Sequence, residues 1–261
     1  MLIYPDAKPN SIAQYKRLLK SINDEKEVPE SLDFLKNKKV IIERIQKYSP
    51  HSQKNILSII ASMTKLNGLK NDYQKEFDNM WRNPIALKRS HDDNLSWEEV
   101  IKIRDSLPVG LEKMVLCLYT MLPPRRNKDY AEMQIVNKRL PKDEKNYLWL
   151  DKNKFVFRDF KTKETFGEQQ IDIPQELRVV IDEYIGKSTK VRPFLTLNGK
   201  AFPHDNTMTY VINKALGRQI GSSQLRHIFL RNKFSDDTED RMTTAKAMAH
   251  NIGTQIQYIA K

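Results

Sequence analysis

The chain has 261 residues, of which 39% are hydrophobic, enough for a sizeable core in one large domain or two smaller ones. Its net charge of +12 and pI of about 9.5 favour a polyanionic partner, most simply DNA or RNA. The single cysteine excludes internal disulfides and cysteine-based metal clusters. The sequence has neither an apolar stretch long enough to span a membrane nor a signal-peptide pattern. We therefore expect a soluble intracellular protein, in the cytoplasm or nucleus of its host, that is not secreted.

The N-terminal third reads as a series of amphipathic helices. Apolar residues recur at helical spacing over 11–22, in two pieces over 32–48, and over 50–66 and 71–81. Residues 1–90 hold 17 Lys and Arg against 10 Asp and Glu, so +7 of the net +12 lies there. This charge is what a helical module that binds the DNA backbone needs, although each basic residue taken alone is equally an ordinary solvated side chain.

A short polar segment separates this third from the rest of the chain. We place a linker at 89–94, between a first domain at 1–88 and a second at 95–261. The second domain opens with Ser96 and Glu99 at the spacing of a capping box, before an apolar-periodic helix. Further helices are predicted over about 110–122 and 126–133, interrupted by Pro123 and Pro124.

After residue 133 the apolar period changes from that of a helix to that of a strand. Three short strands are predicted over 147–150, 154–160 and 170–173. Helices are expected to follow over 175–185, 206–216, 222–234, 238–249 and about 252–260. The chain is therefore predicted to be mainly α (α+β), with a small three-stranded antiparallel sheet.

The C-terminal part carries an Arg, a His and a Tyr in a fixed order: Arg226, His250 and Tyr258, preceded far upstream by Arg126. These groups suit covalent cleavage of a phosphodiester. A Tyr attacks phosphorus and stays attached to it, while arginine forks stabilise the charge on the non-bridging oxygens and a His donates a hydrogen bond.

This set in this order resembles the tyrosine recombinase (phage integrase) family. The family's first Arg stands at the start of a helix with an acid three residues later, and Arg126 and Asp129 match that spacing. Arg125 is the competitor, but its acid lies four residues on, and the apolar positions of Tyr130 and Met133 favour Arg126.

The resemblance also implies a catalytic Lys on a hairpin between the two Arg motifs. The segment 160–167 matches this hairpin, and Lys161, followed by Thr162, resembles the family's Lys-Thr pair. Lys163 is the competing residue, and a Lys on an exposed turn without any catalytic role is the competing interpretation. In the family, this Lys protonates the departing 5′ oxygen.

The second Arg motif of the family is usually His-x-x-Arg. Here Arg226 matches, Leu225 keeps the apolar position and His227 follows, but Ser223 replaces the first His. A serine is no general base near neutral pH, although its hydroxyl can still donate a hydrogen bond to a phosphate oxygen. His227 lies one position further round the helix, so it is a poor substitute.

The residues around His250 resemble the family's Gly-His motif, with Ala249 before the His. Tyr258 follows His250 by eight residues, one fewer than is usual in the family, and no other Tyr follows His250. The resemblance thus implies Tyr258 as nucleophile and His250 as a donor to the scissile phosphate.

Taken together, the resemblance implies a two-domain, C-shaped DNA clamp, with a helical core-binding domain and a catalytic domain. It implies site-specific recombination or integration of double-stranded DNA through a 3′-phosphotyrosyl intermediate, without metal or cofactor. It also implies a homo-tetramer on DNA that is a monomer or weak oligomer in solution. The abundant Lys, Asn and Ile and the altered Arg motifs resemble recombinases of large DNA viruses and mobile elements.

Three alternatives stay open at this point. A type IB topoisomerase uses the same chemistry to relax supercoils. A DNA-binding protein that has kept the scaffold but lost the chemistry is favoured by Ser223. An RNA-binding protein would account for the charge, but the sequence has neither an RNP-like aromatic strand motif nor a glycine-rich loop.

Overall fold

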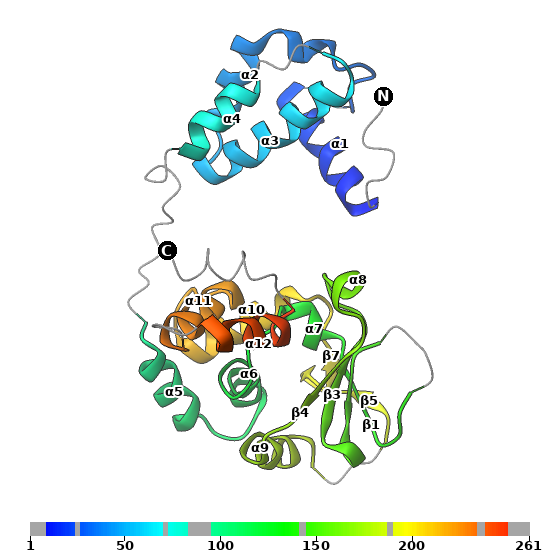
Figure 1. The fold of residues 1–261 in the computed structure, drawn as a ribbon, viewed down its shortest axis with the longest axis vertical. Helices are drawn as coiled ribbons and strands as arrows, with labels where there is room; N and C mark the ends of the chain where they lie inside the picture. Colours follow the sequence, from blue (N-terminus) through cyan, green and yellow to red (C-terminus); the bar gives the residue numbers. More distant parts are fainter. Residues whose placement is uncertain are drawn as a thin grey trace. The chain divides into compact units, whose positions relative to one another are not determined.

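The computed structural model divides the chain into two compact units, residues 1–91 and 92–261 (Figure 1). It describes residues 9–23, 27–69, 73–82, 95–140, 145–186, 190–233 and 238–249, so the predicted linker at 89–94 and the predicted last helix lie outside the described residues. Across the described ranges, none of the helices combines the length and the apolar character needed to cross a lipid bilayer.

The first unit is helical, as the apolar periodicity predicts. Its helices are α1 (Pro9–Asn23), the 3₁₀ turn η1 (Asp33–Lys36), α2 (Lys38–Ile45), α3 (Pro50–Leu66) and α4 (Tyr73–Arg82). Each contributes apolar residues to one shared core, among them Leu19, Ile41, Ile60 and Tyr73. Removing this apolar surface from water is the main force that holds the helices together.

Local sequence signals set the ends of α3. Ser49 is the N-cap residue and its Oγ accepts a hydrogen bond from the Ser52 backbone N–H, while Pro50 fills the first helical position. At the other end Gly68 takes a φ of 65°, which glycine tolerates without strain. Leu69 then donates its backbone N–H to the Thr64 carbonyl at 2.9 Å and closes the last turn.

The second unit is built from helices around a small sheet. Its helices are α5 (Trp97–Ser106), α6 (Leu111–Thr120), α7 (Asn127–Ala131), α8 (Lys163–Phe166), α9 (Gln175–Ile185), α10 (Asn206–Leu216), α11 (Ser222–Lys233) and α12 (Thr238–Ala247), with the 3₁₀ turn η3 (Leu150–Lys152). The predicted capping box at the start of α5 is present: Ser96 and Glu99 exchange side-chain-to-backbone hydrogen bonds.

The sheet has the strand order β4-β3-β2-β1-β5. Its strands are β1 (Gln134–Val136), β2 (Tyr147–Trp149), β3 (Lys154–Phe157), β4 (Gln169–Asp172) and β5 (Arg192–Pro193), and a separate two-stranded ribbon is formed by β6 (Thr196–Leu197) and β7 (Lys200–Ala201). The three predicted strands pair antiparallel, as expected. The sequence did not predict β1, which pairs parallel to β2, or β5 beyond it.

The core of the second unit lies between the sheet and the helices. Figure 1 shows the sheet on one side and α5, α6, α10, α11 and α12 on the other. Fully buried residues of α6 and α7 meet residues of β3 there, and the Tyr130 ring stands edge-on to the rings of Phe155 and Phe157 at 6.1 and 5.7 Å. This packing fixes α7, and with it the Arg125–Arg126 pair that precedes it, against the sheet.

Several predicted boundaries differ from the structure by a few residues, and two of these differences have a visible cause. The strand predicted over 154–160 ends at Phe157, because the backbone N–H groups of Arg158 and Asp159 donate to the Asn146 side chain instead of to a neighbouring strand. The helix predicted over 238–249 ends at Ala247, because Ala249 takes a left-handed φ of 53°.

Candidate active site

Two neighbouring arginines directly precede α7, and they lie in different environments. Arg125 is fully buried, whereas Arg126 is half-buried and occupies the N-cap position of α7 in an extended conformation. Extended backbone sends successive side chains to opposite sides. One arginine of the pair therefore enters the protein, and the other stays accessible to a ligand.

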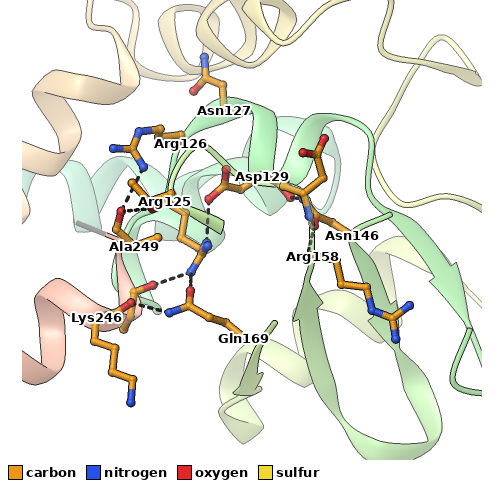
Figure 2. Close-up of polar contacts among 12 residues, drawn as sticks. Arg125, Arg126, Asn127, Asp129, Asn146, Arg158, Gln169, Lys246 and Ala249 are labelled. Carbon is orange, nitrogen blue, oxygen red and sulfur yellow. Dashed lines mark hydrogen bonds and ion pairs between the residues drawn. The ribbon is translucent and has the colours of Figure 1, made fainter. Parts of the chain in front are cut away.

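Buried Arg125 is held on several sides (Figure 2). Its Nε donates to Asp129 Oδ2 at 2.8 Å, and its Nη1 donates to Gln169 Oε1 at 2.6 Å and to the Ala247 carbonyl at 2.8 Å. The guanidinium carbon lies 4.0 Å from the centre of the Phe157 ring. Asp129, which matches the family's acid three residues after Arg126, is thus the ion-pair partner of Arg125.

Half-buried Arg126 contacts the end of the described chain. Its Nη1 donates to the Ala249 carbonyl at 3.2 Å (Figure 2). Ala249 directly precedes His250 in the sequence. The structure therefore brings the first Arg motif to the residue where the His motif begins.

The predicted hairpin is a turn that contains the short helix α8, between β3 and β4. Lys161 is exposed on this turn, and no ion pair or hydrogen bond of its side chain occurs among the described residues. Lys163 instead lies 3.8 Å from the Asp159 carboxylate. Next to Lys161, the Thr162 hydroxyl donates to the Ala249 carbonyl at 2.8 Å. The Lys turn and Arg126 thus meet at one carbonyl oxygen.

A buried asparagine joins the same turn to α7. Asn146 Nδ2 donates to the carbonyls of Asp129 and Asp159 at 3.0 and 2.8 Å. Its Oδ1 accepts the backbone N–H groups of Arg158 and Asp159 at 2.7 and 2.8 Å. One side chain therefore fixes the start of the Lys turn relative to the helix that carries the Arg pair.

The second Arg motif lies on α11. Arg226 is buried to 6% exposure, and its Nη2 donates to Ser223 Oγ at 2.8 Å. The Ser223 hydroxyl accepts this bond and keeps its own proton, which it can donate to a phosphate oxygen. His227 is half-buried on the same helix.

The three arginines act on one buried carboxyl group. Burial raises the pKa of Asp129, and the positive charges of Arg125, Arg126 and Arg226 act against this shift. Arg226 therefore lies in the electrostatic neighbourhood of the Arg125–Arg126 pair, although it comes from a helix far along the chain. Within the described ranges, no three His, Cys, Asp or Glu side chains form a cluster that could hold a metal ion.

The remaining two predicted residues, His250 and Tyr258, lie outside the described residues. The described chain leads to them through α12 and Ala249. Met248 is fully buried in a small apolar cluster with Phe229, Leu230 and Trp97. This cluster packs α12 against α11, the helix that carries Arg226.

Two residues of this region were missed by the sequence reasoning. Gln169 is 8% exposed and bridges Arg125 to the Lys246 carbonyl, to which its Nε2 donates at 2.9 Å. Asn146 was missed as well. The sequence carried only a weak signal for them. Each is a polar residue at the end of an apolar strand, and ordinary turn residues occupy such positions as well.

Solved structures resemble the chain over nearly its whole length. The Tn1549 transposon integrase in complex with circular intermediate DNA has a TM-score of 0.62 at 15% identity, with 99% of this chain and 91% of that chain covered. The lambda integrase dimer bound to a COC′ core site has a TM-score of 0.57 at 15% identity, with 98% and 73% covered. No protein-family model and no curated protein matches the sequence. The chain thus has the tyrosine recombinase/integrase fold.

Proposed function

We propose that this protein is a site-specific recombinase or integrase that cleaves and rejoins double-stranded DNA through a 3′-phosphotyrosyl intermediate. Tyr258 attacks the scissile phosphate, the bond from phosphorus to the 5′ oxygen breaks, and Lys161 protonates that oxygen as it leaves. Arg126, Arg226 and His250 stabilise the charge on the non-bridging oxygens, and Ser223 donates a further hydrogen bond.

One observation carries the proposal. The Ala249 carbonyl accepts hydrogen bonds from Arg126 and from Thr162, the neighbour of Lys161. Segments that carry three motifs, far apart in the sequence, therefore meet at one carbonyl oxygen. The Tn1549 and lambda integrase structures with the same fold are complexes with DNA, which supports DNA as the substrate.

The accessibility of the side chains supports the assignment of roles. Arg126 is half-buried and Lys161 is exposed, so a DNA phosphate can reach both. Arg125 and Lys163 are the alternatives, and they already bind Asp129 and Asp159 respectively. In the first unit, Lys16, Arg17 and Lys20 are exposed on α1, where they can contact the DNA backbone.

The decisive experiment is covalent trapping on nicked suicide duplex DNA in the presence of a metal chelator. We expect a protein–DNA adduct that survives denaturation and that disappears in Tyr258→Phe. An adduct that persists in Tyr258→Phe would overturn the assignment of the nucleophile. Adduct formation with relaxation of supercoiled DNA at any sequence would assign the same chemistry to a type IB topoisomerase.

A second candidate function is DNA binding without strand cleavage. Ser223 favours it, because the family's His at this position is replaced by a group that cannot act as a base. The same trapping experiment separates the two functions. A protein that binds the duplex with a salt-dependent affinity and forms no adduct would be such a DNA-binding protein.

A further inference from the structure

The C-terminal end of α12 is capped by side chains from outside the helix. The last carbonyls of a helix have no partner within it. Here the carbonyls of Lys246, Ala247 and Ala249 accept side-chain hydrogen bonds. We call the donors, which are Arg125, Arg126, Thr162 and Gln169, the carbonyl clasp.

The clasp is anchored in the core of the second unit. Arg125 is fully buried and is bound to Asp129, so it cannot swing away without leaving a buried carboxylate unpaired. Gln169, at the start of β4, binds Arg125 with its oxygen and the Lys246 carbonyl with its nitrogen. The positive guanidinium groups also suit the negative end of the helix dipole.

The clasp ends at the residue from which the chain continues to His250. Ala249 has a left-handed φ of 53°, a conformation that is strained for an L-residue other than glycine. Such a conformation persists when surrounding contacts determine it. The Ala249 carbonyl accepts two hydrogen bonds of the clasp, from Arg126 and Thr162. The residue before it, Met248, is held by its buried side chain.

We infer that Arg125, Gln169 and Thr162 are positioning residues for strand cleavage. They set the direction in which the chain leaves α12 toward His250 and Tyr258, relative to the phosphate site at Arg126 and Lys161. This inference rests on the proposed function. A misplacement of about 1 Å in an active site costs on the order of a hundredfold in rate, so the clasp affects cleavage without contacting the DNA.

The sharpest variant is Gln169→Glu. It keeps an oxygen that can accept from Arg125 but replaces the nitrogen that donates to the Lys246 carbonyl, so it removes one hydrogen bond of the clasp and leaves Asp129 as the ion-pair partner of Arg125. The matched control is Gln170→Glu, the same change at the neighbouring, exposed position of β4. We expect Gln169→Glu to slow adduct formation about ten- to a hundredfold with DNA affinity unchanged, and Gln170→Glu to keep the wild-type rate.

A second variant tests the clasp at a site where folding is not at risk. Thr162→Val removes the hydroxyl that donates to Ala249 but keeps the shape of the half-buried side chain, and Thr162→Ser restores the hydroxyl. Thr165→Val is the control on the same turn, at an exposed position. We expect slower cleavage in Thr162→Val, recovery in Thr162→Ser and no effect in the control. A general loss of stability would not be rescued in this pattern.

Hydrogen exchange supplies a readout that needs no chemistry. The backbone N–H groups of Met248 and Ala249 donate to the carbonyls of Thr244 and Lys246 at 2.9 and 3.0 Å. We expect these amides to exchange about tenfold faster in Gln169→Glu than in the wild type or in Gln170→Glu, because a hydrogen bond that holds the turn is lost.

The outcomes separate this inference from the proposed function. If the wild type forms no adduct, the proposed function fails, and unchanged exchange in Gln169→Glu and Thr162→Val would then overturn the clasp as well. If the wild type forms the adduct and both variants form it at the wild-type rate, the inference is overturned and the proposed function stands. Slower cleavage together with faster exchange supports both.

Discussion

At the scale of single residues, burial separates Arg125 from Arg126. The sequence offers two adjacent arginines before one acid, and either could bind a phosphate. In the structure Arg125 is fully buried against Asp129 and Phe157, while Arg126 remains half-buried at the helix start. The Arg125 charge is neutralised by Asp129 and desolvated inside the protein, so we assign it a structural role, whereas the half-buried guanidinium of Arg126 is the one that a phosphate can reach.

The two arginines should therefore fail in different ways when they are replaced. Arg125→Ala leaves the Asp129 carboxylate buried without its ion-pair partner, and we expect a loss of about 3–5 kcal/mol in the free energy of unfolding. For Arg126→Ala we expect less than about 1 kcal/mol, but a rate of adduct formation lower by about 10²–10³-fold. Denaturant unfolding measures the loss of stability, and covalent trapping measures the loss of rate. An Arg125→Ala variant that is as stable as the wild type but inactive would contradict the assignment of Arg125 as the structural arginine of the pair.

The role of Lys161 can be tested by changing the leaving group. If Lys161 protonates the departing 5′ oxygen, Lys161→Ala should slow cleavage by about 10²–10⁴-fold. A substrate with sulfur in place of that bridging oxygen leaves as a thiolate, whose conjugate thiol has a pKa of only about 8.5, and so needs no general acid. We expect the sulfur substrate to restore the rate of Lys161→Ala.

Lys163→Ala is the matched control, because its side chain is near the Asp159 carboxylate on the same turn. It should keep the wild-type rate on both substrates. If instead the sulfur substrate rescues Lys163→Ala and not Lys161→Ala, the two lysines exchange roles.

At the scale of elements, Asn146 joins the helix of the Arg pair to the turn of the Lys. Asn146→Leu removes four hydrogen bonds at once and leaves backbone groups of Asp129, Arg158 and Asp159 without this partner. Each buried polar group left unsatisfied costs about 1–3 kcal/mol, so we expect at least about 2 kcal/mol of destabilisation. Gln170→Leu, on the exposed face of β4, should change the unfolding free energy by less than about 0.5 kcal/mol. Equal stability of the two variants in denaturant unfolding would refute this role.

The elements themselves followed from local sequence patterns where those patterns were strong. The capping box at Ser96, the Pro50 helix start and the period-2 strands are decided by nearby residues, so the structure agrees with them. The missed strand β1 has only three residues and pairs with β2 and β5, which come later in the chain. A pattern within a short window cannot reveal such non-local pairing.

The residues of the candidate site stay predictions from the resemblance, whereas the hydrogen bonds and ion pairs around them had no signal in the sequence. Spacing alone paired Asp129 with Arg126, yet the ion pair forms with Arg125, because β4 and α12 supply further partners on that side. The left-handed φ of Ala249 could not be predicted from the sequence, because glycine, not alanine, is the residue that favours this conformation. The positions of His250 and Tyr258 remain predictions from the resemblance.

At the scale of the whole molecule, the two units have separate cores. The core of the first unit is formed by α1 to α4 with the turn η1, and that of the second starts with Leu95, next to the capping residue Ser96. The boundary between the units at 91/92 falls within the segment 89–94. Among the described residues, each of these two cores is formed by side chains of one unit alone, as in domains that fold separately.

We therefore expect the fragments 1–88 and 95–261 to fold independently and to bind DNA weakly on their own. The proposed function requires both units to bring basic residues to the same duplex, so their phosphate contacts should add. Each phosphate contact contributes about −0.9 to the slope of log affinity against log salt concentration, and the slope of the intact chain should equal the sum of the two fragment slopes. Tethering should also raise the affinity of the intact chain about 10²–10⁴-fold above that of either fragment. Circular dichroism melts and binding isotherms over a salt series measure these quantities. If one fragment alone reproduces the salt slope and the affinity of the intact chain, then only that unit binds the duplex.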